Sequence, residues 1–317
     1  KDNTNNNSPY KELGLEITAS NLCSEIQLPT DSFNSFVCCL GSINLLHWDE
    51  LVKTDAIETY TLFLNAVIDE FITKSKTMPG MARAYNFAKE HRAIGLGVLG
   101  WHSYLQSELI EFESMEAKLL NTQIFKTIKD KSEAASRELC EIGNIKSIRN
   151  GYANTTLVAI APTKSSSFIH GQVSMGIEPI KSNYFVKDLA KSKTVYKNPF
   201  LESELDKYGL NNDKTWDSIL KKDGSVQHLD FPTKAVFKSF IEISPKEIII
   251  QAGQRQKFID QSQSLNLMIH PSVPAKDINQ LYLFAHESGV KTLYYQFSMS
   301  SAQAFSRNIL ECASCEG

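Results

Sequence analysis

A short segment near the start of the chain carries three side chains that could act together in catalysis. Asn21, Cys23 and Glu25 alternate with Leu22 and Ser24. In an extended segment, side chains two residues apart project from one face, so the three groups would point to the same side. A thiol between a carboxylate and an amide provides a hydrogen-atom or nucleophile centre, a base and an orienting group. The same spacing also fits a buried cysteine between two surface polar residues.

The remaining cysteines extend the thiol chemistry that this segment could perform. Cys38 lies fifteen residues after Cys23, and a loop of that length can bring a second thiol back to the first. Cys38 and Cys39 each also fit a small core residue. Cys312 and Cys315 form a CxxC pair without the second pair that a zinc site needs and without the following helix of a thioredoxin motif. On a flexible tail such a pair suits thiol–disulfide exchange.

A predicted strand followed by a serine-rich turn is a candidate anion-binding element. Residues 155–161 form a β-branched, nearly continuous apolar run, which is typical of a buried strand. Residues 162–167 then form a strand-to-helix turn, whose free backbone N–H groups and hydroxyls could bind an anion. A plain helix N-cap explains the same cluster without a ligand.

The composition is that of an ordinary globular protein and excludes several functional classes. Of 317 residues, 42% are hydrophobic and 22% are charged, and the formal net charge is -3. A mildly acidic chain without a basic block gives no electrostatic basis for nucleic-acid binding. No apolar run approaches the roughly 20 residues that span a bilayer, so we expect no membrane association and a cytoplasmic location.

The elements that must position these residues follow from apolar periodicity. Helical spacing predicts helices over residues 51–72, 81–90, 101–109, 115–140, 234–243, 246–261 and 277–288. A second strand is predicted at 291–297, and the Lys-, Asp- and Asn-rich residues 182–235 indicate a more exposed subdomain. Alternating helices and strands predict an α/β architecture, without distinguishing a barrel from an open sheet. Residues 95–100 match GxGxxG, which after a helical pattern indicates tight packing rather than a dinucleotide site.

Several short motifs follow one another along nearly the whole chain. They are SNLCSEI (20–26), CCLGSIN (38–44), HRAIGLG (91–97), APTKSSS (161–167), GIEP (176–179), QKFIDQS (256–262), VKTLYYQ (290–296) and ECASCEG (311–317). In this order they resemble the C-terminal part of class I ribonucleotide reductase large subunits, with the first two motifs in the place of the family's finger loop.

The resemblance implies a role for each member of the first cluster. Cys23 would be the thiyl radical that abstracts the ribose 3′-hydrogen, Glu25 the base for the 3′-hydroxyl, and Asn21 a hydrogen-bonding partner of the substrate hydroxyls. Cys38 would belong to the redox dithiol that reduces the 2′-position. Cys39 stands where the family usually has another residue, and no role is carried over to it.

The resemblance also implies roles for the later motifs. The substrate diphosphate would bind at four residues of the serine-rich turn, namely Thr163, Ser165, Ser166 and Ser167. Lys164 departs from the small or acidic residue expected between them. Tyr294 and Tyr295 would transfer the radical, although neighbours on an ideal strand face opposite ways and two stacked rings need a departure from that geometry. Cys312 and Cys315 would be a tail shuttle that reduces the active-site disulfide.

For the fold, the family implies the second half of a ten-stranded α/β barrel with a finger loop, a small inserted α/β subdomain and a flexible C-terminal tail. We expect the barrel half over residues 1–180 and the small subdomain with its following helices over 181–270. The last barrel helix and strand would occupy 271–297, and the redox tail 298–317.

The implied reaction is reduction of ribonucleoside diphosphates to deoxyribonucleotides, the precursors for DNA replication. The radical would come from a separate metal-containing small subunit, since this chain shows no metal site, and electrons from thioredoxin or glutaredoxin as the external thiol reductant. The family's N-terminal half, with the partner cysteine of Cys38, is missing, so we expect a split-gene product or fragment that is inactive without a companion chain. The alternatives are a non-catalytic assembly partner that retains the fold, and a thiol–disulfide protein that uses the CxxC pair.

Overall fold

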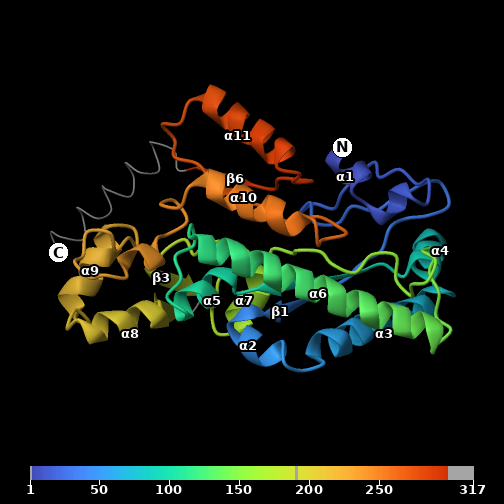
Figure 1. Cartoon of the computed structure of the whole chain (residues 1–317), viewed down its shortest axis with the longest axis horizontal. Coiled ribbons are helices and arrows are strands. Elements are labelled where there is room, and N and C mark those ends of the chain that lie inside the picture. Colours follow the sequence, from blue (N-terminus) through green and yellow to red (C-terminus); the bar gives the residue numbers. More distant parts are fainter. Residues whose placement is uncertain (1, 190–191, 299–317) are drawn as a thin grey trace.

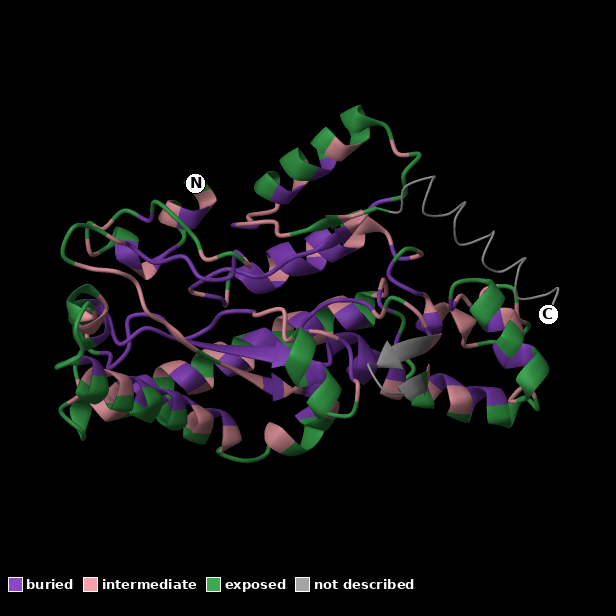
Figure 2. Cartoon of the chain, turned by 180° about the vertical axis from the view of Figure 1, so that it is seen from behind, coloured by how far each residue is buried: buried purple, intermediate pink, exposed green. Residues whose placement is uncertain are grey.

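The computed structural model describes residues 2–189 and 192–298. In Figure 1 the long helix α6 (Met115–Glu141) runs along the molecule, with α3 (Ala56–Ser75) on one side and α10 (Pro245–Gln256) on the other. Helix α11 (Ala275–Glu287) packs beyond α10. The arrangement surrounds a layer of strands, which Figure 2 shows in the buried interior.

Parallel strand segments pair with one another in the order in which they occur along the chain. β1 (Cys39–Asn44) pairs with β2 (Ile94–Leu99) in parallel. β2 in turn pairs with residues 156–160, where Leu96 N–H donates to Leu157 O over 2.7 Å. Residues 158–160 pair with 261–264, and β5 (Leu267–Met268) pairs with β6 (Gln296–Phe297), again in parallel. Five successive parallel segments with helices outside them fit half of an α/β barrel.

Close packing within this layer explains the glycine pattern of residues 95–100. A Cβ atom on Gly97 would lie 2.3 Å from the carbonyl oxygen of Ala159, so only glycine lets the two segments approach. A Cβ atom on Gly95 would meet side-chain atoms of Leu40 and Ala159. The motif follows helix α4 (Ala82–His91) and lies within β2 except for Gly100, which follows the strand. The packing interpretation is confirmed.

The predicted helices are present over similar residues, with one exception. Besides α3, α4, α6, α10 and α11, the structure has α5 (Trp101–Ser107) and α7 (Lys164–Ile169). The helix predicted over 234–243 is wrong, because only the 3-10 helix η3 (Lys234–Phe237) forms before the backbone becomes extended at Lys238. Short helices that periodicity did not indicate are α1 (Asp2–Asn6), η1 (Pro9–Lys11), η2 (Leu45–His47) and α2 (Trp48–Leu51).

The two predicted strands form only in part. Residues 155–160 are buried as expected and Ala161 is partly exposed, but the segment joins its neighbours through isolated bridges rather than as one continuous strand. Within 291–297 only Gln296–Phe297 is regular strand.

A second, smaller apolar cluster lies at one end of the molecule. It is formed by β3 (Tyr184–Leu189), its antiparallel partner β4 (Ser192–Lys197), α8 (Pro199–Lys207) and α9 (Asp213–Lys221). Its buried core contains Leu201, Leu205, Trp216, Ile219, Val226, Phe231, Val236 and Phe237. Asn198 connects it to the main body by donating to Gln106 Oε1 over 2.9 Å. The predicted domain boundaries remain predictions.

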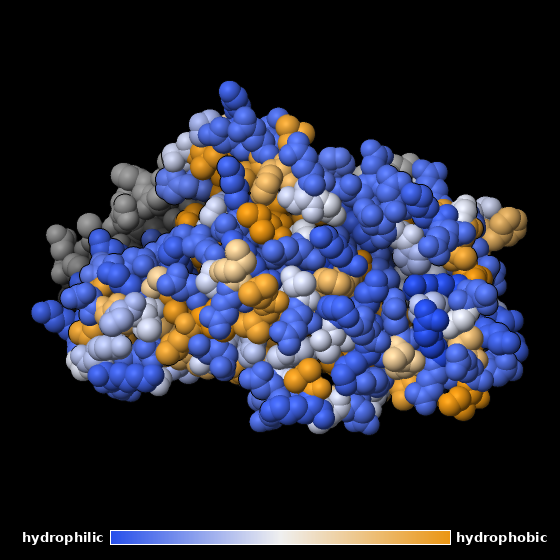
Figure 3. Space-filling model, in the orientation of Figure 1, coloured by the Kyte–Doolittle hydropathy of each residue, from blue (hydrophilic) through white to orange (hydrophobic). Residues whose placement is uncertain are grey.

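An apolar groove of about 610 Å³ lies on the outer surface between α10 and α11. Figure 3 shows apolar side chains gathered on this face. Among the groove's lining residues are Met268, Ile269, Val273, Leu281 and Phe284. Among the helices of residues 2–189 and 192–298, none has the length and hydrophobicity needed to cross a bilayer.

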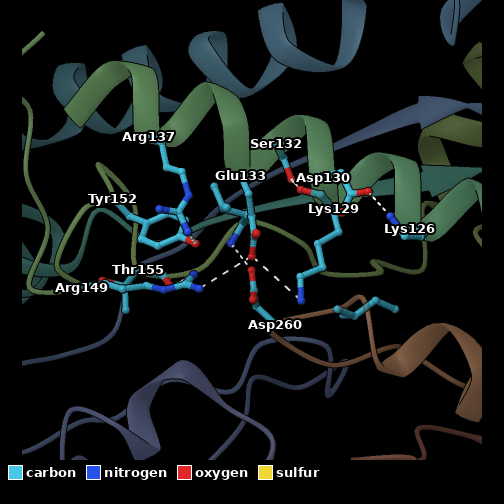
Figure 4. A network of polar contacts seen from close by, with 12 residues as sticks. Lys126, Lys129, Asp130, Ser132, Glu133, Arg137, Arg149, Tyr152, Thr155 and Asp260 are labelled. Atoms are coloured by element: carbon cyan, nitrogen blue, oxygen red, sulfur yellow. Dashed lines mark hydrogen bonds and ion pairs between the residues drawn. The ribbon is translucent and has the colours of Figure 1, made fainter. Parts of the chain in front are cut away.

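A network of charged residues connects α6 to the starts of two strand segments (Figure 4). Glu133 on α6 lies 3.7 Å from Arg149 and 4.0 Å from Lys129. The guanidinium of Arg149 lies 3.9 Å from the ring centre of Tyr152, over its face. Asp260 accepts the Leu157 N–H over 2.8 Å, which joins the segments that begin near 156 and 261. The network therefore helps to fix the strands that carry the candidate site.

Candidate active site

The segment that contains Cys23 is a tight hairpin loop rather than an extended strand. Ser20 and Gln27 form an antiparallel bridge, and Asn21 Oδ1 accepts the backbone N–H of Ile26 over 3.1 Å. Ser24 has φ of 62°, a left-handed conformation that closes the turn. The prediction of one extended face is therefore wrong, because the Asn21 side chain closes the loop instead of standing beside the thiol on a strand.

Two strand segments hold this loop in place. Ser262 N–H donates to Glu25 O over 2.9 Å, and the Thr292 hydroxyl donates to Ser24 O over 2.9 Å. Gln27 N–H donates to Gln261 Oε1 over 2.8 Å. The loop is thus bonded both to the segment 261–264 and to the residues before Tyr294.

The Cys23 thiol contacts a tyrosine that is distant in sequence. Its Sγ donates to the phenol oxygen of Tyr294 over 3.4 Å. Hydrogen bonds with Cys23 and with Tyr295 raise the pKa of Tyr294, so the phenol stays protonated. The structure therefore brings together a thiol and a phenol in a geometry that suits hydrogen-atom exchange.

The rings of Tyr294 and Tyr295 lie against each other in a tilted stack, with ring centres 3.9 Å apart and an interplanar angle of 33°. If the β5–β6 ladder continued regularly, Tyr295 N–H would donate to Leu265 O. Tyr294 N–H takes that carbonyl instead, over 2.8 Å, while Leu267 N–H donates to Tyr295 O over 2.9 Å. One extra residue is therefore inserted, which makes a β-bulge and lets two sequence neighbours face the same way. This is the departure from strand geometry that a stacked pair requires.

Glu25 lies beneath the loop, 3% exposed. The Ser264 hydroxyl lies 2.9 Å from Glu25 Oε2 and 2.7 Å from the Cys23 carbonyl oxygen. Ser264 therefore fixes the carboxyl group relative to the residue that carries the thiol.

Cys38 reaches the same region from the start of β1. Gln261 Nε2 lies 3.9 Å from Cys38 Sγ, and the same side chain accepts the Gln27 N–H, so Gln261 lies between the finger loop and the second thiol. Burial raises the pKa of Cys38 well above its ordinary value, and the neighbouring Cys39 and Glu25 raise it further. Burial also raises the pKa of Cys39. Cys38 is therefore held as a protonated thiol.

The serine-rich turn divides into an internal and an exposed part. Thr163 Oγ1 accepts Gly176 N–H over 2.8 Å, and Ser167 Oγ donates to Thr163 O over 2.8 Å. Ser165 and Ser166, in the first turn of α7, are exposed. Thr163 and Ser167 thus shape the turn, while the other two hydroxyls face outward beside the exposed Lys164.

An apolar cavity of about 370 Å³ adjoins this turn. It contains few polar groups, among them Glu178 and Lys181. Its other lining residues include Ser167, Phe168, Val173, Met175, Phe185 and Tyr196.

Several residues of the site were not assigned from the sequence. Gln261 lies inside the QKFIDQS motif. Ser264 and Asn266 follow Ser262, the last residue of that motif, at every second position, a spacing that could have indicated a shared face. Glu178 lies inside GIEP. The predicted Cys312 and Cys315 lie outside the described residues. In residues 2–189 and 192–298, no three His, Cys, Asp or Glu side chains gather as a metal site.

Comparisons with known proteins agree on one family. The family model described as "Ribonucleotide reductase, barrel domain" matches residues 1–147 and 143–296. The chain is 39% identical, over 90% of its length, to the ribonucleoside-diphosphate reductase large subunit of Invertebrate iridescent virus 3, and covers 46% of that relative. It is 36% identical, over 97% of its length, to the putative large subunit of Frog virus 3 (isolate Goorha), and covers 57% of it.

Among solved structures, the chain is similar to the Actinobacillus ureae class Id ribonucleotide reductase alpha subunit. The TM-score is 0.90 at 52% sequence identity, over 96% of this chain and 58% of that one. The chain therefore spans about half the length of the relatives that it matches.

Proposed function

Because the chain belongs to the ribonucleotide reductase large-subunit family, we propose that it reduces ribonucleoside diphosphates to deoxyribonucleotides as part of a larger enzyme. The resemblance seen in the sequence motifs, and the α/β barrel fold that it implied, are confirmed. The observation that carries the proposal is the continuous path from Tyr295, which is 50% exposed, through the stacked Tyr294 to the Cys23 thiol.

The first step moves a radical inward along this path. An oxidising equivalent from a metal-containing small subunit reaches Tyr295, whose exposed ring is accessible to a partner. Tyr294 in its radical form takes the hydrogen atom of the Cys23 thiol, so an O–H bond forms and the S–H bond breaks. The 3.4 Å contact and the protonated resting state of Tyr294 support this exchange.

The second step acts on the ribose. The Cys23 thiyl radical removes the 3′-hydrogen atom, and the Glu25 carboxylate takes the 3′-hydroxyl proton. Asn21, whose Oδ1 accepts the Ile26 N–H, would bind the substrate hydroxyls through its Nδ2 group. The 2′-hydroxyl takes a proton from the pair formed by Cys38 and a second cysteine and leaves as water. The same pair supplies the hydrogen that enters the 2′-carbon and becomes a disulfide. Glu25 returns its proton to the 3′-oxygen, and Cys23 returns its hydrogen atom to the 3′-carbon.

The environment of Cys38 suits this donor role. Reduction of the 2′-position needs a thiol that still carries its hydrogen, and burial keeps Cys38 protonated. Cys312 and Cys315 would then reduce the new disulfide by exchange, with thioredoxin or glutaredoxin as the external reductant.

The serine-rich turn would hold the substrate diphosphate. Ser165 and Ser166 present exposed hydroxyls, and the first N–H groups of α7 point out of the helix. Thr163 and Ser167 contribute by fixing the turn through their internal bonds. Lys164 adds a positive charge beside the phosphate groups.

The enzyme needs further polypeptides under this proposal. A companion chain would supply the other barrel half and the partner cysteine of Cys38. A small subunit would generate the radical, and the reaction would take place in the cytoplasm.

Reconstitution tests the proposal. The chain, the companion and the small subunit are combined with a dithiol and a ribonucleoside diphosphate, and deoxyribonucleotide formation is measured. We expect product from the full mixture and none from the chain alone or from Cys23→Ala. Cys140→Ala is the matched control, since Cys140 is a half-buried thiol on α6 and should retain full activity. Equal activity of Cys23→Ala and wild type would instead favour a non-catalytic assembly partner.

A further inference from the structure

We propose that Glu178 and Asn266 are positioning residues that hold Tyr294 and Tyr295 in the stacked arrangement. The functional part of this inference rests on the proposed function, since a radical path requires the two rings to stay together. Its structural part can be tested without any activity.

The bulge leaves one backbone group without a ladder partner. Because Tyr294 N–H occupies the Leu265 carbonyl, the N–H of Tyr295 has no carbonyl opposite it in the ladder. The side chain of Asn266 takes this position, and its Oδ1 accepts the Tyr295 N–H over 2.8 Å. An unsatisfied, partly buried N–H would favour a return to the regular ladder, which would separate the rings.

Glu178 determines which way the Asn266 amide faces. Asn266 Nδ2 donates to Glu178 Oε1, and the two side chains are 5% and 7% exposed. Above its pKa of about 7 the Glu178 carboxylate only accepts hydrogen bonds, so it selects the NH2 side of the amide and leaves the oxygen for Tyr295; the carbonyl oxygen of the protonated form can accept the same bond. The flipped amide would place oxygen against carboxylate and NH2 against N–H, which are two repulsive contacts.

The segment that carries Glu178 is itself fixed on several sides. Glu178 N–H donates to Met175 O over 2.9 Å, and Ile180 N–H donates to the ring Nδ1 of the buried His102 over 2.9 Å. The Lys181 ammonium lies 4.0 Å from the ring centre of Phe297 in β6. Residues 178–181 therefore contact Asn266, on the segment opposite the bulge, and Phe297, at the end of the strand that contains it.

This segment also adjoins the serine-rich turn. Gly176 N–H, two residues before Glu178, is the donor that Thr163 accepts. The candidate diphosphate turn and the tyrosine pair are thus connected through one short, buried segment.

Hydrogen exchange of single backbone amides tests the structural part on the chain by itself. The wild-type Tyr295 amide should be protected from exchange. The Ile269 N–H, which lies in the same ladder, serves as the reference amide. Asn266→Ala should raise the Tyr295 exchange rate about 10-fold or more. Glu178→Met, which keeps the volume but removes the acceptor, should raise it several-fold. Glu178→Gln should stay close to wild type, because its amide oxygen still accepts from Asn266.

Turnover in the reconstituted enzyme tests the functional part. Glu178→Met should lower kcat about 10- to 100-fold, since small displacements of reacting groups have effects of that size, while KM stays within about twofold. Glu178→Gln should restore kcat. The matched control is Glu204→Met, which removes another carboxyl group, 3% exposed, from the separate small cluster and should leave kcat unchanged.

The outcomes separate the two claims. A rapidly exchanging Tyr295 amide in the wild type overturns the inference even if every variant fails to fold. So does unchanged Tyr295 exchange in both Asn266→Ala and Glu178→Met, or a kcat for Glu178→Met no lower than for Glu204→Met. If the wild-type assembly makes no product while the exchange results hold, the proposed function fails and the positioning of the pair stands.

Discussion

Replacing Glu178 by glutamine would isolate the effect of one buried carboxyl group on the stability of the chain. Burial raises the pKa of Glu178 from 4.5 to about 7, against the opposing effects of the Asn266 hydrogen bond and the Lys181 charge. Below pH 4.5 the group is protonated in both the folded and the unfolded chain. Between the two pKa values it is ionised only in the unfolded chain, so folding takes up a proton.

The contribution of Glu178 to stability is therefore fully present below the unfolded pKa and is lost as the pH rises through the folded pKa. The difference between 4.5 and about 7 corresponds to about 3 kcal/mol. Glutamine cannot ionise. The unfolding free energy of Glu178→Gln minus that of the wild type should thus increase by up to about 3 kcal/mol as the pH rises from about 4.5 to 8.

Urea unfolding of both proteins across this pH range measures the difference between their unfolding free energies. The contributions of groups that titrate in both proteins cancel in that difference. Glu204→Gln is the matched control. Although burial raises the pKa of Glu204, hydrogen bonds from Lys207 and Thr233 hold it below its ordinary value, so its contribution should not change above pH 4.5. A difference between Glu178→Gln and wild type that stays constant with pH would refute the reasoning.

Two further predictions concern the radical path and the barrel. Tyr294→Phe should abolish turnover in the reconstituted enzyme while changing the unfolding free energy by about 1 kcal/mol, because the phenol hydrogen bonds that it removes, with Cys23 and Tyr295, are partly exposed; retained turnover would contradict the path. Gly97→Ala should destabilise the chain by about 3 kcal/mol or more in the same urea assay, because its Cβ would lie 2.3 Å from Ala159 O; a neutral effect would contradict the described packing.

Long periodic segments made the helices predictable from sequence. The pattern over residues 115–140 places its apolar residues at helical spacing, and the structure has α6 at Met115–Glu141. The cysteine loop was harder, because alternating polar residues in 21–25 look like a strand. Its geometry depends on a side-chain bond from Asn21 to Ile26 and on a left-handed Ser24, which alternation does not show.

The candidate site was predictable residue by residue only where motifs carried a resemblance. Tyr294 and Tyr295 were assigned as a pair, but nothing local indicates that their strand bulges. The bond that stabilises the bulge comes from Asn266, and the group that orients Asn266 is Glu178, 88 residues earlier in the chain. Such long-range side-chain contacts leave no periodic signal in the sequence.

The most direct test of the central claim is the kinetic isotope effect of a 3′-deuterated ribonucleoside diphosphate in the reconstituted enzyme. If the Cys23 thiyl radical removes the 3′-hydrogen, the deuterated substrate should form product more slowly than the protiated one, and Cys23→Ser should form none. Product formation by Cys23→Ser at the wild-type rate would show that this thiol is not the radical centre and would contradict the account.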